Sequence, residues 1–272
     1  DPSRIKNRGT NQVIFSVVIL SILQGITEFL PISSSAHLLL FPWAFSLPNP
    51  GLAFDAAIHI GTALALVIFF WRDFYNLIKK RDRLILYILI ASVPAALAGF
   101  LGDKLIEEYL HQGSLAPLIV GVGIIFFGGL MYYVDRKAKL DKDLGHIGKK
   151  KALFIGLAQV LALIPGTSRS GITITAGEFL GLDRESAARF SFLLATPISL
   201  GAGLYKLLQL VKEPSNGLSI WLVILGIVIS FVTGMIVIKW LLDYLRKHSL
   251  LIFVWYRFIL GASVVILWLI RR

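Results

Sequence analysis

Long hydrophobic runs, separated by short polar stretches, dominate the chain. A helix that spans the hydrocarbon core of a membrane needs about 20 predominantly apolar residues. Six segments qualify, at roughly 53–71, 84–101, 116–134, 186–211, 219–238 and 250–270. Hydrophobic residues make up 56% of the 272 residues, and the mean hydropathy is +0.77. These features predict an all-α polytopic membrane protein with six transmembrane helices.

Two further apolar regions, 13–47 and 151–182, are interrupted. The interruptions are Pro31, Pro42 and Pro48 in the first region, and Pro165 and Gly171 in the second. Each uninterrupted half has only about 10–15 residues, which is enough to reach the middle of a membrane but not to cross it. Both regions therefore predict a re-entrant helix-loop-helix hairpin, which enters and leaves the membrane on the same side.

Lysine and arginine concentrate in three loops. One lies at 72–83, another at 135–150, and the third holds Lys239, Arg246 and Lys247. Positively charged loops remain in the cytoplasm. All three share that side only if 151–182 doubles back, so the charges favour a hairpin there, with both chain ends outside. The same rule accounts for the net charge of +11 without a nucleic-acid partner, and no nucleic-acid-binding module is apparent.

The two hairpins share a spacing of polar residues. In each, a glutamine precedes a serine by nine residues and a second serine follows two positions later: Gln24, Ser33 and Ser35 in the first, Gln159, Ser168 and Ser170 in the second. Three spans separate the hairpins, so the two copies would be inverted in the membrane. We therefore expect a single membrane domain over 1–272, with inverted repeats at roughly 13–134 and 151–270 and a basic cytoplasmic loop at 135–150.

The first hairpin carries ionisable residues where a charge costs about 2.5–3.5 kcal/mol. Ser34 and His37 are three residues apart and would share a face of a new helix. This pairing suits a hydroxyl nucleophile beside a general base. Glu28 could orient His37 or bind a divalent cation, and Gln24, four residues earlier, offers an amide oxygen. Ser33 lies where the new helix would begin after Pro31.

The second hairpin offers groups that bind anions. The segment 165–168 favours a new helix N-terminus, whose free N–H groups and partial positive charge attract phosphate. Arg169 adds a planar fork for phosphate oxygens, and Ser168, Ser170 and Thr173 add hydroxyl donors. If the hairpins meet at the middle of the membrane, two helix ends and Arg169 converge on one phosphate.

Simpler interpretations of these residues exist. Buried serines often bond the backbone or hold helices together. Glu28 and Arg169 could form a purely structural ion pair, and His37 could be an interfacial histidine. Asp55 and His59, four residues apart, could face the same cavity or merely sit at its mouth.

At these positions the chain resembles the bacitracin-resistance family of undecaprenyl-diphosphate phosphatases. One family signature is Glu or Gln, three residues and Glu, followed by Pro-x-Ser-Ser and a histidine; it is matched by Gln24, Glu28, Pro31, Ser33, Ser34 and His37. The other is Pro-Gly-x-Ser-Arg-Ser-x-x-Thr, matched by Pro165, Gly166, Ser168, Arg169, Ser170 and Thr173. The departures are small: Gln24 takes the glutamine option, and Ser35-Ala36 replaces a common Thr-Gly.

The resemblance implies a phosphatase that removes the terminal phosphate of a C55 polyprenyl diphosphate, recycles the lipid carrier of cell-wall synthesis and confers bacitracin resistance. It implies a bacterial plasma-membrane location, a site open to the outside, and a divalent cation, Ca²⁺ or Mg²⁺. The implied catalytic residues are Ser34, His37, Glu28 and Arg169. The residues implied to bind the diphosphate are Ser33, Ser168, Arg169, Ser170 and Thr173. The cation would be bound by Glu28 and Gln24. The sequence is compatible with a homo-oligomer and does not fix the oligomeric state.

A polyprenyl-phosphate transporter or flippase is the alternative function. Inverted repeats, broken helices and helix ends at mid-membrane also occur in transporters. The two functions differ in their need for Ser34 and His37, because a flippase requires an anion clamp but no nucleophile.

Overall fold

The computed structural model describes residues 2–45, 50–106, 115–212 and 219–271, and over these residues it contains helices and no β-strand. Six helices are long and apolar enough to cross a membrane: α3 (Leu52–Lys79), α4 (Arg83–Ile106), α5 (Ala116–Lys137), α8 (Arg184–Lys212), α9 (Ile220–Leu245) and α10 (Leu251–Arg271). They coincide with the six predicted segments, so the all-α fold with six potential spans is confirmed. Lys239 lies inside α9 rather than in the basic loop after it.

The two interrupted regions form helix-loop-helix units. The first joins α1 (Pro2–Thr27) to α2 (Ser34–Phe45), and the second joins α6 (Lys149–Val160), with a short 3₁₀ turn at Leu161–Leu163, to α7 (Arg169–Phe179). The breaks fall at Pro31 and Pro165 as predicted, but Pro42 and Gly171 lie within α2 and α7. A proline near the end of a packed helix is tolerated because neighbouring groups replace the lost hydrogen bond. Pro48 lies outside the described residues.

The second hairpin returns to the end of the molecule at which it begins. The loop before α6 includes Lys142, whose backbone N–H donates to the carbonyl of Gly181 at 3.0 Å. The N–H of Asp183 donates to the carbonyl of Lys142 at 2.8 Å. The chain therefore leaves α7 beside the loop that feeds α6, as a hairpin requires. Its re-entrant placement in a bilayer stays a prediction.

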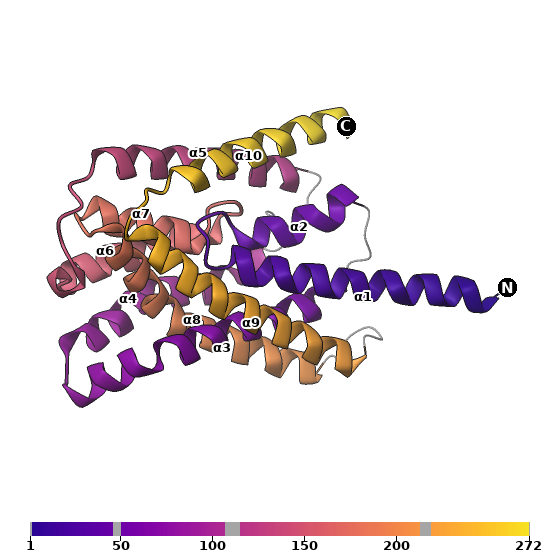
Figure 1. Cartoon of the computed structure of the whole chain (residues 1–272), viewed down its shortest axis with the longest axis horizontal. Coiled ribbons are helices and arrows are strands. Elements are labelled where there is room, and N and C mark those ends of the chain that lie inside the picture. Colours follow the sequence, from indigo (N-terminus) through magenta and orange to yellow (C-terminus); the bar gives the residue numbers. More distant parts are fainter. Residues whose placement is uncertain (1, 46–49, 107–114, 213–218, 272) are drawn as a thin grey trace.

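Helices from the first half of the chain pack against helices from the second half. α1 packs against α9, α6 packs against α4, and α5 packs against α10. Figure 1 shows the three basic loops toward the left end and both termini toward the right end. This arrangement is the packing that two inverted copies of one unit would give, although the division into repeats stays a prediction.

Small residues let these helices approach closely. A Cβ atom on Gly156 of α6 would lie 2.2 Å from the carbonyl oxygen of Ala91 in α4. A Cβ atom on Gly61 of α3 would lie 2.4 Å from the carbonyl oxygen of Ile227 in α9. Such contacts are typical of helices packed in a membrane, where association depends on close backbone approach.

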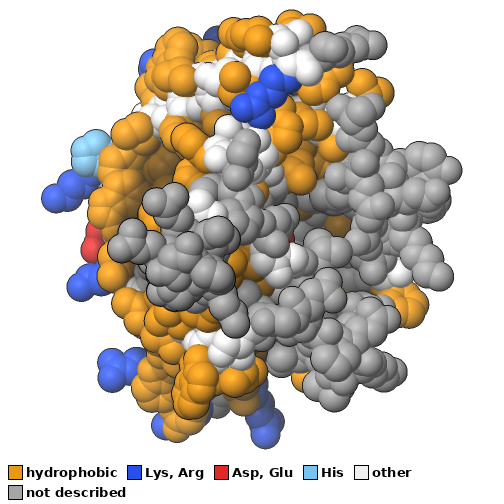
Figure 2. Space-filling view, turned by 90° about the vertical axis from the view of Figure 1, so that its right-hand side faces the viewer, with side chains coloured by type: hydrophobic (Ala, Val, Ile, Leu, Met, Phe, Trp, Pro, Cys, Tyr) orange, Lys and Arg blue, Asp and Glu red, His pale blue; other side chains and the backbone are white. Residues whose placement is uncertain are grey.

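The described outer surface is rich in apolar side chains. Phe100, Phe126, Trp221 and Ile259 are among the large hydrophobic residues left exposed. Viewed from the end that carries the termini, the described surface is largely hydrophobic with few charged side chains (Figure 2). Exposed apolar surface on this scale is suited to lipid, so the chain is a membrane protein.

Candidate active site

The two hairpin loops meet in the interior and are held together by Arg257 of α10, which is 1% exposed. Its guanidinium donates to the carbonyl of Pro31 in the first loop at 3.2 Å, and to those of Gly166 and Thr167 in the second at 2.8 and 2.9 Å. It also donates to the carbonyl of Ile124 in α5 at 3.1 Å. Arg257 therefore satisfies backbone acceptors that the broken helices leave open.

Replacing Arg257 with methionine should destabilise the protein strongly. Each buried carbonyl left without a donor costs about 1–3 kcal/mol, and the three loop carbonyls of Pro31, Gly166 and Thr167 lose the guanidinium donor here. We expect the variant to unfold at a clearly lower temperature and to lose activity. Tryptophan fluorescence of the protein in detergent measures the unfolding temperature. Arg271→Met is the matched control, because Arg271 of the same helix donates to carbonyls at the exposed end of α2, where water can substitute. Equal unfolding temperatures for the two variants would contradict this role.

A serine in a left-handed backbone conformation precedes the second helix of each hairpin. The φ angle is 76° at Ser33 and 72° at Ser168. Such values cost about 1–3 kcal/mol for a non-glycine residue and cluster at functional sites. Each serine also lies near a second hydroxyl, Ser33 Oγ at 3.4 Å from Ser35 Oγ and Ser168 Oγ at 3.2 Å from Ser170 Oγ. The two hairpins thus have similar turns where their loops meet.

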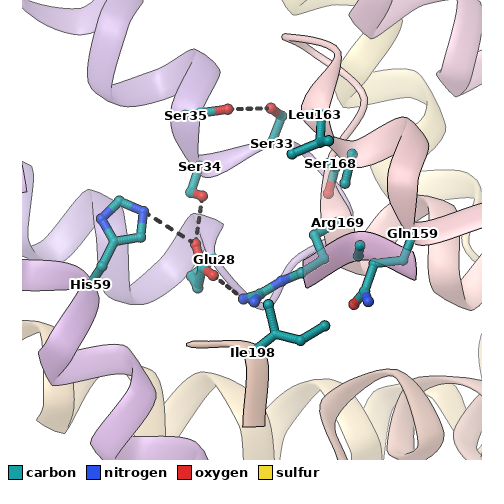
Figure 3. A pocket seen from close by; sticks show the side chains of 12 residues that line it. Glu28, Ser33, Ser34, Ser35, His59, Gln159, Leu163, Ser168, Arg169 and Ile198 are labelled. Atoms are coloured by element: carbon teal, nitrogen blue, oxygen red, sulfur yellow. Dashed lines mark hydrogen bonds and ion pairs between the residues drawn. The ribbon is translucent and has the colours of Figure 1, made fainter. Parts of the chain in front are cut away.

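Glu28 is the centre of the polar cluster between the hairpins (Figure 3). One carboxylate oxygen pairs with the guanidinium of Arg169. The other accepts from the Ser34 hydroxyl at 2.6 Å and from the Gln24 amide at 3.2 Å, and lies 3.8 Å from His59 Nε2. One carboxylate therefore joins the predicted nucleophile Ser34, the arginine predicted to bind phosphate and a histidine.

This cluster lies on the wall of a pocket of about 250 Å³. The pocket is lined by residues of both hairpin loops together with α3, α4 and α8: Glu28, Ser33, Ser34, Ser35, His59, Ala95, Gln159, Ala162, Leu163, Ser168, Arg169 and Ile198. The guanidinium of Arg169 is also fixed by Ser199, whose hydroxyl accepts from it at 2.6 Å. Two of the five guanidinium N–H groups are thus occupied, which leaves the others for an anion.

Most of the predicted site residues converge there. Glu28, Ser33, Ser34, Ser168 and Arg169 line the pocket, and Gln24 bonds Glu28 from behind.

Ser170 and Thr173 are not among the lining residues. The Ser170 hydroxyl donates to the carbonyl of Leu30 at 3.0 Å. The Thr173 hydroxyl donates to the carbonyl of Arg169 at 2.8 Å and shares a hydrogen bond of 2.6 Å with the Ser191 hydroxyl. Their positions on α7 turn both hydroxyls toward protein neighbours. In this structure they hold α7 in place rather than facing the pocket.

The predicted contact between Ser34 and His37 is not formed. A backbone carbonyl only accepts hydrogen bonds, so His37 Nδ1 carries the proton that it donates to the carbonyl of Ser33 at 2.7 Å. Its Nε2 then accepts from the Tyr256 hydroxyl at 2.6 Å. The bond to the preceding turn directs the ring toward α10, and Ser34 bonds Glu28 instead. The predicted hydrogen bond between Ser34 and His37 is therefore wrong for this structure. That His37 is required for activity stays a prediction.

Besides Ser35 and four apolar residues, two polar side chains that line the pocket were not among the predicted site residues. His59, which could have lain only at the cavity mouth, is on the pocket wall. Gln159 is 2% exposed, and neither atom of its side-chain amide has a hydrogen-bond partner among the described residues. Gln24 and Gln159 each precede a serine by nine residues, and this equal spacing is the signal in the sequence that could have identified Gln159 as a site residue.

The side chains of this cluster provide only some of the ligands that a divalent cation requires. No group of three or more acidic, histidine or cysteine side chains occurs among the described residues. Glu28 offers one carboxylate, and the buried amide oxygen of Gln24 has no partner among them. Such a donor set suits a cation that takes its remaining ligands from phosphate and water, as Mg²⁺ often does.

Comparison with known proteins gives one consistent match. The family model described as "Bacitracin resistance protein BacA" matches residues 17–263. A protein of Pelotomaculum thermopropionicum named undecaprenyl-diphosphatase is 43% identical over 262 residues, covering 93% of this chain and 96% of that protein. Proteins of the same name from Desulforudis audaxviator and Alcanivorax borkumensis are 42% and 43% identical; each covers 94% of this chain and 98% of its own length.

Proposed function

The chain belongs to the bacitracin resistance protein family, and on that premise we propose that it is a membrane phosphatase that hydrolyses undecaprenyl diphosphate to undecaprenyl phosphate and phosphate. The product is the lipid carrier of cell-wall synthesis, so this activity recycles the carrier and confers bacitracin resistance. The observation that carries the proposal is the contact of Glu28 with both Ser34 and Arg169 in one pocket.

Substrate binding would begin with Arg169. The terminal phosphate competes with Glu28 for the guanidinium, and Ser33 and Ser168 add hydroxyl donors at the pocket wall. The Gln159 amide, which lacks a partner among the described residues, supplies a further donor for the diphosphate. Once Arg169 pairs with phosphate, the Glu28 oxygen that had paired with the guanidinium becomes free, while the other oxygen still accepts from Ser34.

The first chemical step would be attack by Ser34. Its Oγ forms a bond to the terminal phosphorus while the bond from phosphorus to the bridging oxygen breaks, and undecaprenyl phosphate leaves. The hydroxyl proton passes to Glu28, whose oxygen already accepts it at 2.6 Å. Arg169 stabilises the charge on the transferred phosphoryl group.

The second step would be hydrolysis of the phosphoserine. Water forms a bond to phosphorus and passes one proton to a second acceptor, the bond between Oγ and phosphorus breaks, and Glu28 returns its proton to the Ser34 oxygen. Phosphate leaves and the enzyme is regenerated.

A divalent cation, Ca²⁺ or Mg²⁺, would be held by Glu28, the Gln24 amide oxygen and the substrate phosphates. Bound there, it would neutralise charge on the phosphoryl oxygens. Because the described residues offer few ligands of their own, we propose that the cation enters together with the diphosphate.

The plasma membrane, with the pocket open to the outside, is the proposed location. His59 lies seven residues after the start of α3 at Leu52 and 20 residues before its end at Lys79, beside a basic loop. At a rise of 1.5 Å per residue, these intervals are about 10 Å and about 30 Å. The pocket is therefore nearer the end away from the basic loops, which is outside if those loops are cytoplasmic.

Cysteine labelling tests this orientation, and the chain has no cysteine of its own. Exposed positions in the three basic loops are Lys80, Lys139 and Lys247, and Ser219 is exposed at the opposite end. We expect cysteines at the first three to react with a membrane-impermeant maleimide only after permeabilisation, and Ser219→Cys to react in intact cells. Labelling of Lys139→Cys and Lys247→Cys from opposite sides would contradict the hairpin at 151–182.

Phosphate release by the purified protein tests the function. Undecaprenyl diphosphate in detergent should yield inorganic phosphate, and EDTA should suppress the reaction until Ca²⁺ or Mg²⁺ is restored. An active protein insensitive to EDTA would remove the cation from the proposal. Transfer of the intact lipid across vesicles without phosphate release would favour the transporter instead.

A further inference from the structure

The proposed mechanism needs a second proton acceptor. In the first step Glu28 receives the proton of Ser34, and it remains protonated while the phosphoserine exists. The attacking water must also lose a proton, which Glu28 cannot accept before it has returned its own to the serine. A group with a free lone pair in the pocket is therefore required.

His59 has such a lone pair. Its Nδ1 lies 2.7 Å from the carbonyl oxygen of Asp55, one turn earlier in α3. That oxygen only accepts, so Nδ1 carries the proton of the neutral ring and Nε2 is the basic nitrogen. No hydrogen bond is recorded for Nε2 among the described residues, whereas both ring nitrogens of His37 are engaged.

The free nitrogen is close to the reacting groups. His59 Nε2 lies 3.8 Å from the same Glu28 oxygen that accepts from Ser34 at 2.6 Å. The His59 side chain is 40% exposed, so water can reach it. Figure 3 shows His59 and Arg169 on opposite sides of Glu28. If Arg169 holds the phosphoryl group from one side of Glu28, His59 is on the other side (Figure 3), where water reaches it.

The charges around His59 come from few groups. Among the described residues, Glu28 and Arg169 are the charged residues that line the pocket with it, and Asp55 lies on its own helix. The described charged side chains of the adjoining helices α8 and α9 lie at their ends beside the basic loops: Arg184, Glu185, Arg189, Lys239 and Asp243.

We propose that His59 is the general base for the hydrolytic water, an inference that rests on the proposed function. Nε2 takes a proton from water as the water oxygen bonds to phosphorus and the bond from phosphorus to Ser34 Oγ breaks. Glu28 returns its proton to the serine oxygen. The imidazolium then releases its proton to solvent, so the histidine is ready for another turnover.

Loss of this base should stop the reaction after its first step. For His59→Ala we expect kcat to fall by about 10²–10³, within the range for a positioned base. In rapid-quench experiments with substrate labelled in its terminal phosphate, the variant should release about one undecaprenyl phosphate per enzyme and retain the label on Ser34. Added imidazole should restore turnover and discharge the label.

His248→Ala is the matched control. His248 Nδ1 also bonds a carbonyl four residues earlier, that of Tyr244 at 3.1 Å, but this histidine is exposed near a basic loop. It should behave like the wild type.

Two results for His59→Ala would overturn the role of this histidine while leaving the phosphatase intact. One is turnover within about threefold of the wild type. The other is a loss of turnover with neither trapped label nor imidazole rescue. Absence of phosphate release by the wild type would instead overturn the proposed function, and the role of His59 with it.

Discussion

Arg169→Ala should lose turnover by about 10³-fold or more, the range seen when an arginine that stabilises a transferring phosphoryl group is removed. Arg169 begins α7, lines the pocket and is held by Glu28 and Ser199. Removing it deletes the group proposed to bind the phosphate and leaves Glu28 without its arginine partner. Phosphate release and binding of the undecaprenyl diphosphate should both fall.

Arg169→Lys separates the effect of charge from that of geometry. Lysine restores a positive charge near Glu28, but its ammonium cannot contact Glu28, Ser199 and a phosphate with one planar fork. We therefore expect poor recovery of kcat in a protein with near-normal stability. Activity close to that of the wild type would contradict the fork geometry.

Arg189→Ala is the control for loss of a half-buried ion pair. Arg189 of α8 pairs with Asp73 of α3, toward the basic end of the molecule. Its side chain is 33% exposed, comparable to 21% for Arg169. If both alanine variants unfold at similar temperatures but only Arg169→Ala is inactive, the effect of Arg169 is local to the pocket.

Local sequence patterns predict the helices and the positions of their breaks. A spanning helix satisfies its own backbone, so its length and hydropathy are visible in the sequence, as in α9. The breaks at Pro31 and Pro165 follow from the missing N–H of proline. The same rule fails at Pro42, because the packing of α2 decides whether a proline ends a helix near its terminus.

Partners across the site could not be predicted from spacing alone. Ser34 and His37 were expected to pair because helical periodicity puts them on one face. Which neighbour a ring contacts depends on other helices, and α10 supplies Tyr256 to His37. Arg257 is more than 220 residues from the Pro31 carbonyl that it binds. Such long-range contacts follow from the packing of the halves and leave no local pattern.

Ser34→Ala should lower the activity by about 10²–10⁴-fold, as expected when a positioned nucleophile is removed. The Ser34 hydroxyl is the one that donates to Glu28, at 2.6 Å. Ser35 also lines the pocket, but its hydroxyl lies 3.4 Å from that of Ser33 and has no recorded bond to Glu28. Ser35→Ala is therefore the matched control and should lose much less. Ser33→Ala should be intermediate, since Ser33 precedes α2 and adds a donor to the phosphate.

Rapid quench with substrate labelled in its terminal phosphate decides how Ser34 acts. If Ser34 attacks phosphorus, acid quench during turnover should recover label on Ser34, and the Ser34→Ala variant should trap none. The strong bond to Glu28 favours this pathway, because the proton acceptor is already in contact with the hydroxyl. Full activity of Ser34→Ala would eliminate the nucleophile. Lost activity without any trapped label in the wild type or in His59→Ala would instead indicate direct attack by water on the bound diphosphate, with Ser34 serving to orient it.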